Sequence, residues 1–140
     1  MKYIDTDIIQ ISILDAETVL AESRKKVWAE LNYEKYIFQL IEAYQLTENA
    51  MTNHYGMIID RNSHYSIAPV DAYNVFNVFN RLKAIALVIN DERRKYIPVS
   101  FEQDLYQGEM KVFQTVGQAR NWIKQMLNES IKQYNKGNLL

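Results

Sequence analysis

Two short apolar runs with an amphipathic segment between them constrain the fold of this chain most strongly. The runs are Met57–Ile59 and Ala84–Ile89, and each is followed by polar residues. Runs of this kind are typical of strands that are buried on both faces of a sheet. The segment from Pro69 to Leu82 gathers its apolar residues on one side, which predicts a helix that begins at the proline. A strand, a helix and a second such strand predict a βαβ unit with parallel strands.

Composition excludes several classes of protein. At 140 residues the chain is expected to form one domain over residues 1–140. A formal net charge of -1 gives no electrostatic attraction for non-specific nucleic-acid binding, and the absence of cysteine excludes disulfides and a cysteine nucleophile. Asp5 and Asp7 lie where the apolar core of a signal peptide would begin, and no apolar run is long enough to span a bilayer. We therefore expect a cytoplasmic protein.

The first part of the chain predicts one strand clearly and three further elements. Ile8–Leu14 alternates apolar and polar residues, which predicts a strand near one edge of the sheet. A helix is expected over Ala16–Leu31, because an aspartate that can cap it precedes the segment and apolar residues recur on one side. The aromatic and β-branched residues of Tyr36–Glu42 favour a strand, although the same segment also has helical spacing. A short helix is then expected over Thr47–Tyr55.

The C-terminal part predicts a helix, a strand and a final helix. Glu92–Leu105 has the pattern of a helix that Pro98 interrupts. Lys111–Gln114 predicts the last strand. Thr115 and Gln118 then form a capping-box pattern, which indicates the start of the final helix.

The final helix has the most regular apolar stripe in the chain. Its apolar residues recur every three or four positions and are Ala119, Trp122, Ile123, Met126, Leu127, Ile131 and Tyr134. We expect Trp122 to be largely buried beside Phe113 and the polar tail from Asn135 to fray. Together the segments predict an α/β single domain, with a small, mostly parallel or mixed sheet of about four to five strands and helices packed on it.

Two motifs resemble those of a known family. In LKAIALVIND and KVFQTVGQARNWI, a strand of small aliphatic residues precedes a strand-to-helix signature matched by Lys111, Phe113, Ala119 and Trp122. In IIDRNSHYSIAP, the matching loop positions are Arg61, Asn62, Ser63, Tyr65, Ser66 and Pro69. Both motifs resemble the STAS-like domains of the SpoIIAA-like group, the loop in small members from Bacteroidetes-type bacteria. The resemblance covers residues 36–127.

This resemblance carries expectations about fold and function. It implies a small mixed sheet with helices packed on it, related in shape to CRAL-TRIO lipid-binding domains. It also implies a regulatory or protein-interaction domain that is not an enzyme, with a carrier of a small apolar ligand as the alternative. In the anti-sigma-factor antagonists of this group, a serine at the start of the central helix is phosphorylated. The motif around that serine is absent here, and Ser66 is the nearest candidate.

The loop that begins at Asp60 is the candidate site. In open α/β sheets, ligands bind beyond the carboxyl ends of the strands, and this loop leaves such an end. The candidates for contact with a ligand or partner are Asp60, Arg61, Asn62, Ser63, His64, Tyr65 and Ser66. In the alternative interpretation, Asp60 and Asn62 only shape the turn, and Arg61 pairs with a local carboxylate.

Catalytic and metal-binding interpretations have less support. Ser63 and His64, with Asp60 nearby, have the residue types of a hydrolase, but no glycines form a nucleophile elbow around the serine. His54, Asp60 and His64 offer metal-ligand types without a typical ligand spacing. We therefore predict no catalytic residue, no metal and no cofactor, and a protein partner or a small apolar ligand.

The first half of the chain is rich in tyrosine. These residues are Tyr33, Tyr36, Tyr44, Tyr55, Tyr65 and Tyr73. Their rings are expected to close the edge of the core with their hydroxyls in water, or to form an amphipathic surface for a partner. The first strand carries few charges to protect an edge, so we also predict a homodimer through that strand or the tyrosine-rich region.

Overall fold

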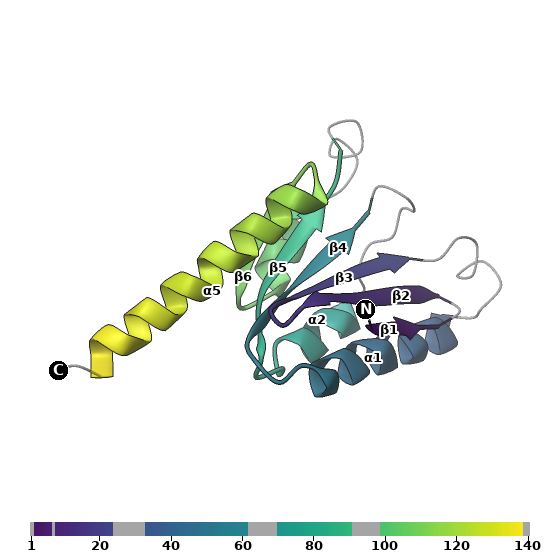
Figure 1. Cartoon of the computed structure of the whole chain (residues 1–140). Coiled ribbons are helices and arrows are strands. Elements are labelled where there is room, and N and C mark those ends of the chain that lie inside the picture. The colour runs from purple at the N-terminus through teal and green to yellow at the C-terminus, as the bar shows by residue number, and fades with distance from the viewer. Residues whose placement is uncertain (1, 7, 24–32, 62–69, 91–98, 139–140) are drawn as a thin grey trace.

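The computed structural model describes residues 2–6, 8–23, 33–61, 70–90 and 99–138 of the chain. These residues form one mixed sheet of six strands with helices on both faces (Figure 1). The strands lie side by side in chain order, from β1 to β6. The predicted α/β class is therefore confirmed, with more strands than the four to five that the sequence indicated.

The first part of the sheet is antiparallel. Strand β1 (Lys2–Asp5) forms the edge and pairs with β2 (Ile9–Asp15), which forms a hairpin with β3 (Thr18–Ser23). In the turn of this hairpin, the Asp15 carboxylate accepts a hydrogen bond of 2.8 Å from the Glu17 N–H. The strand predicted over Ile8–Leu14 is therefore confirmed near the edge of the sheet.

From β3 onward, neighbouring strands are parallel. The next strands are β4 (Tyr55–Asp60), β5 (Leu82–Val88) and β6 (Glu109–Phe113). Helix α2 (Val70–Phe76) lies between β4 and β5 in the chain, so the predicted strand-helix-strand unit is present. Helix α4 (Val99–Leu105) precedes β6. Almost every residue of β4 and β5 is buried, which explains their continuous apolar runs.

Helices cover the two faces of the sheet unequally. Helix α1 (Tyr33–Ala50) packs with α2 on one face, and α4 contacts α2. We call α1, α2 and α4 the helix layer. Helix α5 (Val116–Asn138) packs on the other face against β4, β5 and β6, and its C-terminal part extends past the sheet (Figure 1). Among the residues that the structure describes, no helix combines the length and the apolar character needed to cross a bilayer.

Small residues allow α5 to approach the sheet closely. Ala84 and Ala86 of β5 belong to the core cluster beneath this helix. At Gly56 of β4, an added Cβ would lie 2.5 Å from Cγ2 of Ile123, which is fully buried. Only glycine therefore fits at this position without a shift of α5 or of the Ile123 side chain.

The start of α5 matches the predicted capping box. The Gln118 N–H donates to Thr115 Oγ1 at 3.2 Å, and the Thr115 N–H donates to Gln118 Oε1 at 3.3 Å. Trp122 packs beside Phe113, as predicted, with ring centroids 5.5 Å apart. The prediction that Trp122 is largely buried is wrong, because it is half-buried and Ile123 occupies the centre of the contact.

The helix predicted over Ala16–Leu31 is wrong where the structure describes it. Thr18–Ser23 is strand β3, and residues 24–32 lie outside the described residues. Val19 and Ala21 are buried on one side, while Leu20 on the other side is half-buried. This alternation has the period of a strand, and the tight turn at Asp15 makes the segment a hairpin partner of β2.

The strand predicted over Tyr36–Glu42 is also wrong. This segment lies inside helix α1, which buries Leu40, Ala43 and Tyr44 at helical spacing. Thr47 does not begin a separate helix, because it lies inside α1 and its hydroxyl donates to the Ala43 carbonyl at 2.9 Å. Tertiary packing therefore overrides the strand preference of aromatic and β-branched residues here.

Several further predictions fall partly or wholly outside the described residues. The helix start at Pro69 and the break at Pro98 both lie there, although the structure describes a helix from Val70 and another from Val99. At the other end of the chain, helix α5 extends to Asn138. The polar tail that begins at Asn135 is therefore helical as far as Asn138.

Candidate functional site

The candidate loop leaves the sheet at the carboxyl end of β4. Asp60 ends this strand, is half-buried, and lies opposite Glu22 of β3 and Val88 of β5. The N–H of Arg61 donates to the Val88 carbonyl at 3.0 Å. The structure thus describes Asp60 and Arg61 of the predicted site. The other predicted residues, Asn62, Ser63, His64, Tyr65 and Ser66, lie outside the described residues.

Arg61 is bound inside the core by a carboxylate from α4. Its two terminal guanidinium nitrogens donate hydrogen bonds to the two oxygens of Glu102. The Tyr73 hydroxyl, from α2, donates to Glu102 Oε1 at 2.6 Å. The exposed fraction is 1% for Arg61, 0% for Glu102 and 1% for Tyr73. We refer to these residues as the Arg61 cluster.

Burial and the ion pair determine which groups of this cluster hold their protons. Burial by itself lowers the pKa of Arg61, but the hydrogen bonds and charge of Glu102 raise it by more, so the guanidinium keeps its charge. Burial, followed by the charge of Glu102, raises the pKa of Tyr73. Burial also raises the pKa of the neighbouring Tyr44. Both phenols therefore stay neutral at physiological pH, and Tyr73 acts as a hydrogen-bond donor.

The Arg61 cluster joins elements of the fold rather than presenting a charge to solvent. An anionic ligand would have to displace Glu102 to reach the guanidinium, and it would leave that carboxylate buried without its partner. The contact agrees with the alternative interpretation in which Arg61 pairs with a carboxylate. The partner is not local, however, because Glu102 lies 41 residues further along the chain.

A small cavity lies beside the Arg61 cluster, between the sheet and α1. Its volume is about 10 Å³, and it is lined by Ile9, Ala21, Ser23, Tyr36, Leu40, Tyr44, Ile59 and Arg61. That volume accommodates about one water molecule. Pockets for small organic ligands are typically about 300–1,000 Å³. This cavity therefore has no room for an apolar ligand.

The residues considered for metal binding do not converge in the described part of the chain. His54 is exposed just before β4, whereas Asp60 ends the same strand, which separates them by roughly 20 Å at the usual rise per residue. His64 and Ser63, on which the hydrolase interpretation depends, both lie outside the described residues. Among the described residues, no three His, Asp or Glu side chains are grouped to hold a metal ion.

Sequence reasoning missed Glu102 and the role of Tyr73. Glu102 stands three residues before Leu105, so the two share one side of α4, and it stands four residues before the buried Tyr106, which directly follows the helix. Tyr73 stands three residues before the buried Phe76 on α2. A carboxylate on the apolar side of a helix, together with an arginine directly after a buried strand, was the available signal for a buried ion pair.

A larger concave region lies at the other end of the sheet, where the parallel strands begin. Its volume is about 400 Å³, and it is lined by Ala16, Glu17, Thr52, Asn53, His54 and Leu127. Ala16 and Glu17 belong to the β2–β3 turn, Thr52, Asn53 and His54 to the loop between α1 and β4, and Leu127 to α5. We call this region the α5 hollow. Apart from the buried Leu127, its lining residues are exposed or half-buried.

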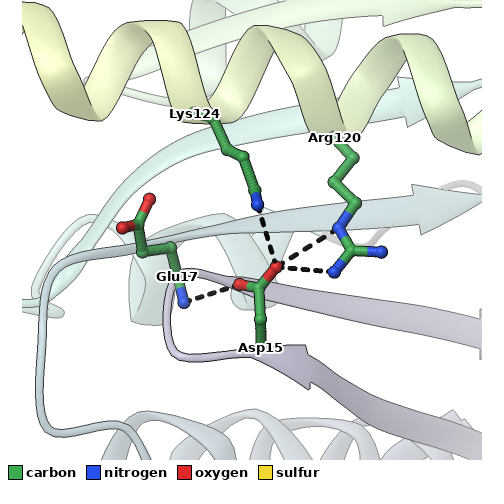
Figure 2. A network of polar contacts seen from close by, with 4 residues as sticks. All are labelled: Asp15, Glu17, Arg120 and Lys124. Carbon is green, nitrogen blue, oxygen red and sulfur yellow. Dashed lines mark hydrogen bonds and ion pairs between the residues drawn. The ribbon is translucent and has the colours of Figure 1, made fainter.

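Asp15 attaches the turn beside this hollow to α5 (Figure 2). Its Oδ2 accepts a hydrogen bond of 2.7 Å from Nη2 of Arg120 and lies 3.5 Å from Nζ of Lys124. Partial burial by itself would raise the pKa of Asp15. The hydrogen bonds from Arg120 and the Glu17 N–H, together with the Lys124 charge, lower this pKa by more than burial raises it, to about 2. Arg120 and Lys124, two cations of α5, are thus both directed at Asp15.

Comparison of this chain with known proteins gives no match. No protein-family model, no curated protein and no solved structure matches the chain. The fold and its sites are therefore defined by the chain's own residues: an α/β unit with a six-stranded mixed sheet, a buried ion pair at one end and a polar hollow at the other.

Proposed function

We propose that this chain is a cytoplasmic, non-catalytic regulatory or protein-interaction domain of the STAS-like type, and that the helix layer is its contact face. The observation that carries the proposal is the distribution of exposed apolar side chains. In the described part of the chain, the large apolar side chains that are most exposed are Phe38, Leu46, Val70, Val78 and Phe101. All of them belong to the helix layer or to the turn that follows α2, and none belongs to residues 116–129, the part of α5 whose side chains the structure describes.

A one-sided distribution of this kind is informative, whereas single exposed apolar residues are common on any surface. Phe38 is 69% exposed and Val78 is 74% exposed, which is unusual for side chains of their size. Apolar and aromatic side chains are enriched in the buried centre of protein interfaces. A protein partner on the helix layer would remove this surface from water.

The alternative functions have weaker support. A carrier of an apolar ligand needs an enclosed apolar pocket, and the cavity beside Arg61 has room for about one water molecule. A hydrolase would depend on Ser63 and His64. We expect assays with esterase and phosphatase substrates to detect no turnover that the change Ser63→Ala abolishes. Serine-dependent turnover in either assay would replace the proposal with the hydrolase.

Native mass spectrometry of the full chain purified from its host tests the proposal directly, because it reports bound proteins and retained small molecules together. We expect a stoichiometric protein partner with the unmodified chain. Val78→Lys and Phe101→Lys, which place charges on the turn after α2 and on α4, are expected to abolish that complex.

Gln125→Lys is the matched control, since it adds the same charge at an exposed position of α5. This variant should keep the partner, and all three variants should keep the far-ultraviolet circular dichroism of the unmodified chain. A retained apolar small molecule without a protein partner would favour the carrier. A chain without any bound species would contradict the interaction proposal.

A further inference from the structure

Among the residues that the structure describes, the Glu17 carboxylate in the lining of the α5 hollow has no ion-pair partner. Glu17 lies in the turn that Asp15 fixes, and its backbone N–H is held by the Asp15 carboxylate. Arg120 and Lys124, the nearby cations of α5, are both directed at Asp15, and the Glu17 carboxylate points away from Asp15 and Arg120 (Figure 2). The lining of the hollow therefore includes one carboxylate, carried by a turn whose backbone Asp15 holds in place.

The other polar side chains of the hollow are also available for binding. Within the described part of the chain, Glu17, Thr52, Asn53 and His54 make no side-chain hydrogen bond or ion pair, although they line one concave region. Leu127 is buried and supplies an apolar surface beside them. The volume of about 400 Å³ is within the usual range for small-ligand sites. Concave shape, apolar surface and a few polar groups are the features that such sites share.

From this arrangement we infer that the α5 hollow binds a primary ammonium group on a short aliphatic chain. The ammonium is complementary to the Glu17 carboxylate and can donate further hydrogen bonds to the oxygens of Thr52 and Asn53. The aliphatic chain is complementary to Leu127. An anion is not favoured, because the Glu17 carboxylate belongs to the lining of the hollow and would repel it.

Two sources can supply this chemistry, a free small amine or a lysine side chain of a protein partner. The lysine source rests on the proposed interaction function, whereas the free amine does not. The two sources can be distinguished with two probes. The first is n-butylammonium chloride, and the second is Nα-acetyl-lysine methylamide, which presents the same ammonium on a peptide backbone.

Nuclear magnetic resonance titration of the ¹⁵N-labelled full chain at pH 7 and constant ionic strength tests the inference. We expect n-butylammonium to shift the backbone amide signals of Glu17, Asn53 and His54 with about millimolar affinity. We expect n-butanol, which has the same aliphatic chain without the charge, to bind about tenfold more weakly. Binding of the lysine probe as well would identify a partner's lysine as the source, and binding of n-butylammonium alone would identify a free amine.

Glu17→Gln is the decisive variant, because it removes the charge and keeps the shape and the backbone N–H. It should weaken n-butylammonium binding about tenfold, whereas Glu42→Gln, at an exposed position of α1, should leave it unchanged. Equal binding of butanol and butylammonium, unchanged binding to a folded Glu17→Gln variant, or no shifts up to about 100 mM would each overturn the inference. Loss of the helix-layer complex in native mass spectrometry would leave the butylammonium result unaffected, so the two proposals fail separately.

Discussion

Arg61 carries a full positive charge that solvent does not reach, and Glu102 is the partner that allows it to remain there. Breaking a buried ion pair by neutralising one member leaves the other charge without compensation, which typically costs about 3–5 kcal/mol. We therefore expect Glu102→Gln to lower the free energy of unfolding by about 3–5 kcal/mol, measured by urea denaturation.

Two variants provide the controls for this measurement. Asp104→Asn removes a carboxylate from an exposed position of the same helix, so its effect should stay within about 0.5 kcal/mol. Tyr73→Phe removes one hydrogen bond from Glu102 and should cost about 1–2 kcal/mol. A loss below about 1 kcal/mol for Glu102→Gln would contradict the burial of the ion pair.

At the scale of residues, the sequence could indicate one half of this cluster. An arginine directly after an apolar strand is conspicuous, and pairing with a carboxylate was one of the two interpretations offered for Arg61. Its partner could not be identified, because local patterns carry no information about a contact across 41 residues. Gln103 and Asp104, directly after Glu102, are polar and exposed, so this part of the sequence resembles the surface of a helix.

At the scale of elements, the predictions succeeded where the burial pattern of a segment was unambiguous. Strands β4 and β5 are buried on both faces, and α5 has a long apolar stripe with a capping box, so their sequences have one consistent interpretation. Thr18–Ser23, the described part of the helix predicted over Ala16–Leu31 that forms a strand, and Tyr36–Glu42 were mispredicted because each fits two periods. Which period applies depends on the surface that the segment packs against, and that surface is made by distant parts of the chain.

The contact between the β2–β3 turn and α5 should make stability depend on pH. The pKa of Asp15 is about 2 in the folded protein, below its ordinary value of 3.8. The contribution of the ionised Asp15 carboxylate to the free energy of unfolding is therefore complete above about pH 4 and is lost as the pH falls toward 2. At pH 7, Asp15→Asn should lower the free energy of unfolding by about 1–2 kcal/mol, since the contact is partly exposed.

Urea denaturation of both proteins from pH 7 to pH 2 measures this dependence. The difference between the unmodified chain and Asp15→Asn should shrink below about pH 4. Glu42→Gln, at an exposed position in the middle of α1, should behave like the unmodified chain throughout. A difference of the same size at pH 7 and pH 2 would exclude the Asp15 carboxylate as its cause.

The close approach of α5 to β4 gives a second prediction at this scale. Gly56→Ala places a methyl group 2.5 Å from Cγ2 of the buried Ile123, so we expect a loss of stability of about 1–3 kcal/mol in denaturant melts. The loss should be smaller in an Ile123→Ala background, where the opposing atoms are absent. Gly117→Ala is the control, because its nearest contact is 3.9 Å away and alanine favours a helix, so this change should be neutral or stabilising.

At the scale of the whole molecule, the order of the strands excludes one of the two predicted dimer contacts, the one through the strand predicted over Ile8–Leu14. Strand β2 pairs with β1 on one side and β3 on the other, so its backbone has no free edge for a second chain. In the tyrosine-rich region, Tyr55 lies on β4 and Tyr73 on α2, whereas Tyr36 and Tyr44 lie on helix α1, half-buried and buried respectively. The exposed apolar side chains of this helix are Phe38 and Leu46, eight positions apart and therefore on similar sides of it.

We predict a symmetric homodimer in which α1 of one chain packs against α1 of its partner, because a two-fold axis would bury both copies of Phe38 and Leu46 at once. Light scattering across a tenfold dilution series around micromolar concentration should show a mass that falls toward the 16.5 kDa of one chain. Phe38→Glu should give the monomer mass at every concentration, because each copy would place a charge in the apolar contact, whereas Phe101→Glu on α4 should keep the dimer. A constant mass near that of one chain for the unmodified protein would exclude the dimer, and a dimer that survives Phe38→Glu would exclude α1 as its contact.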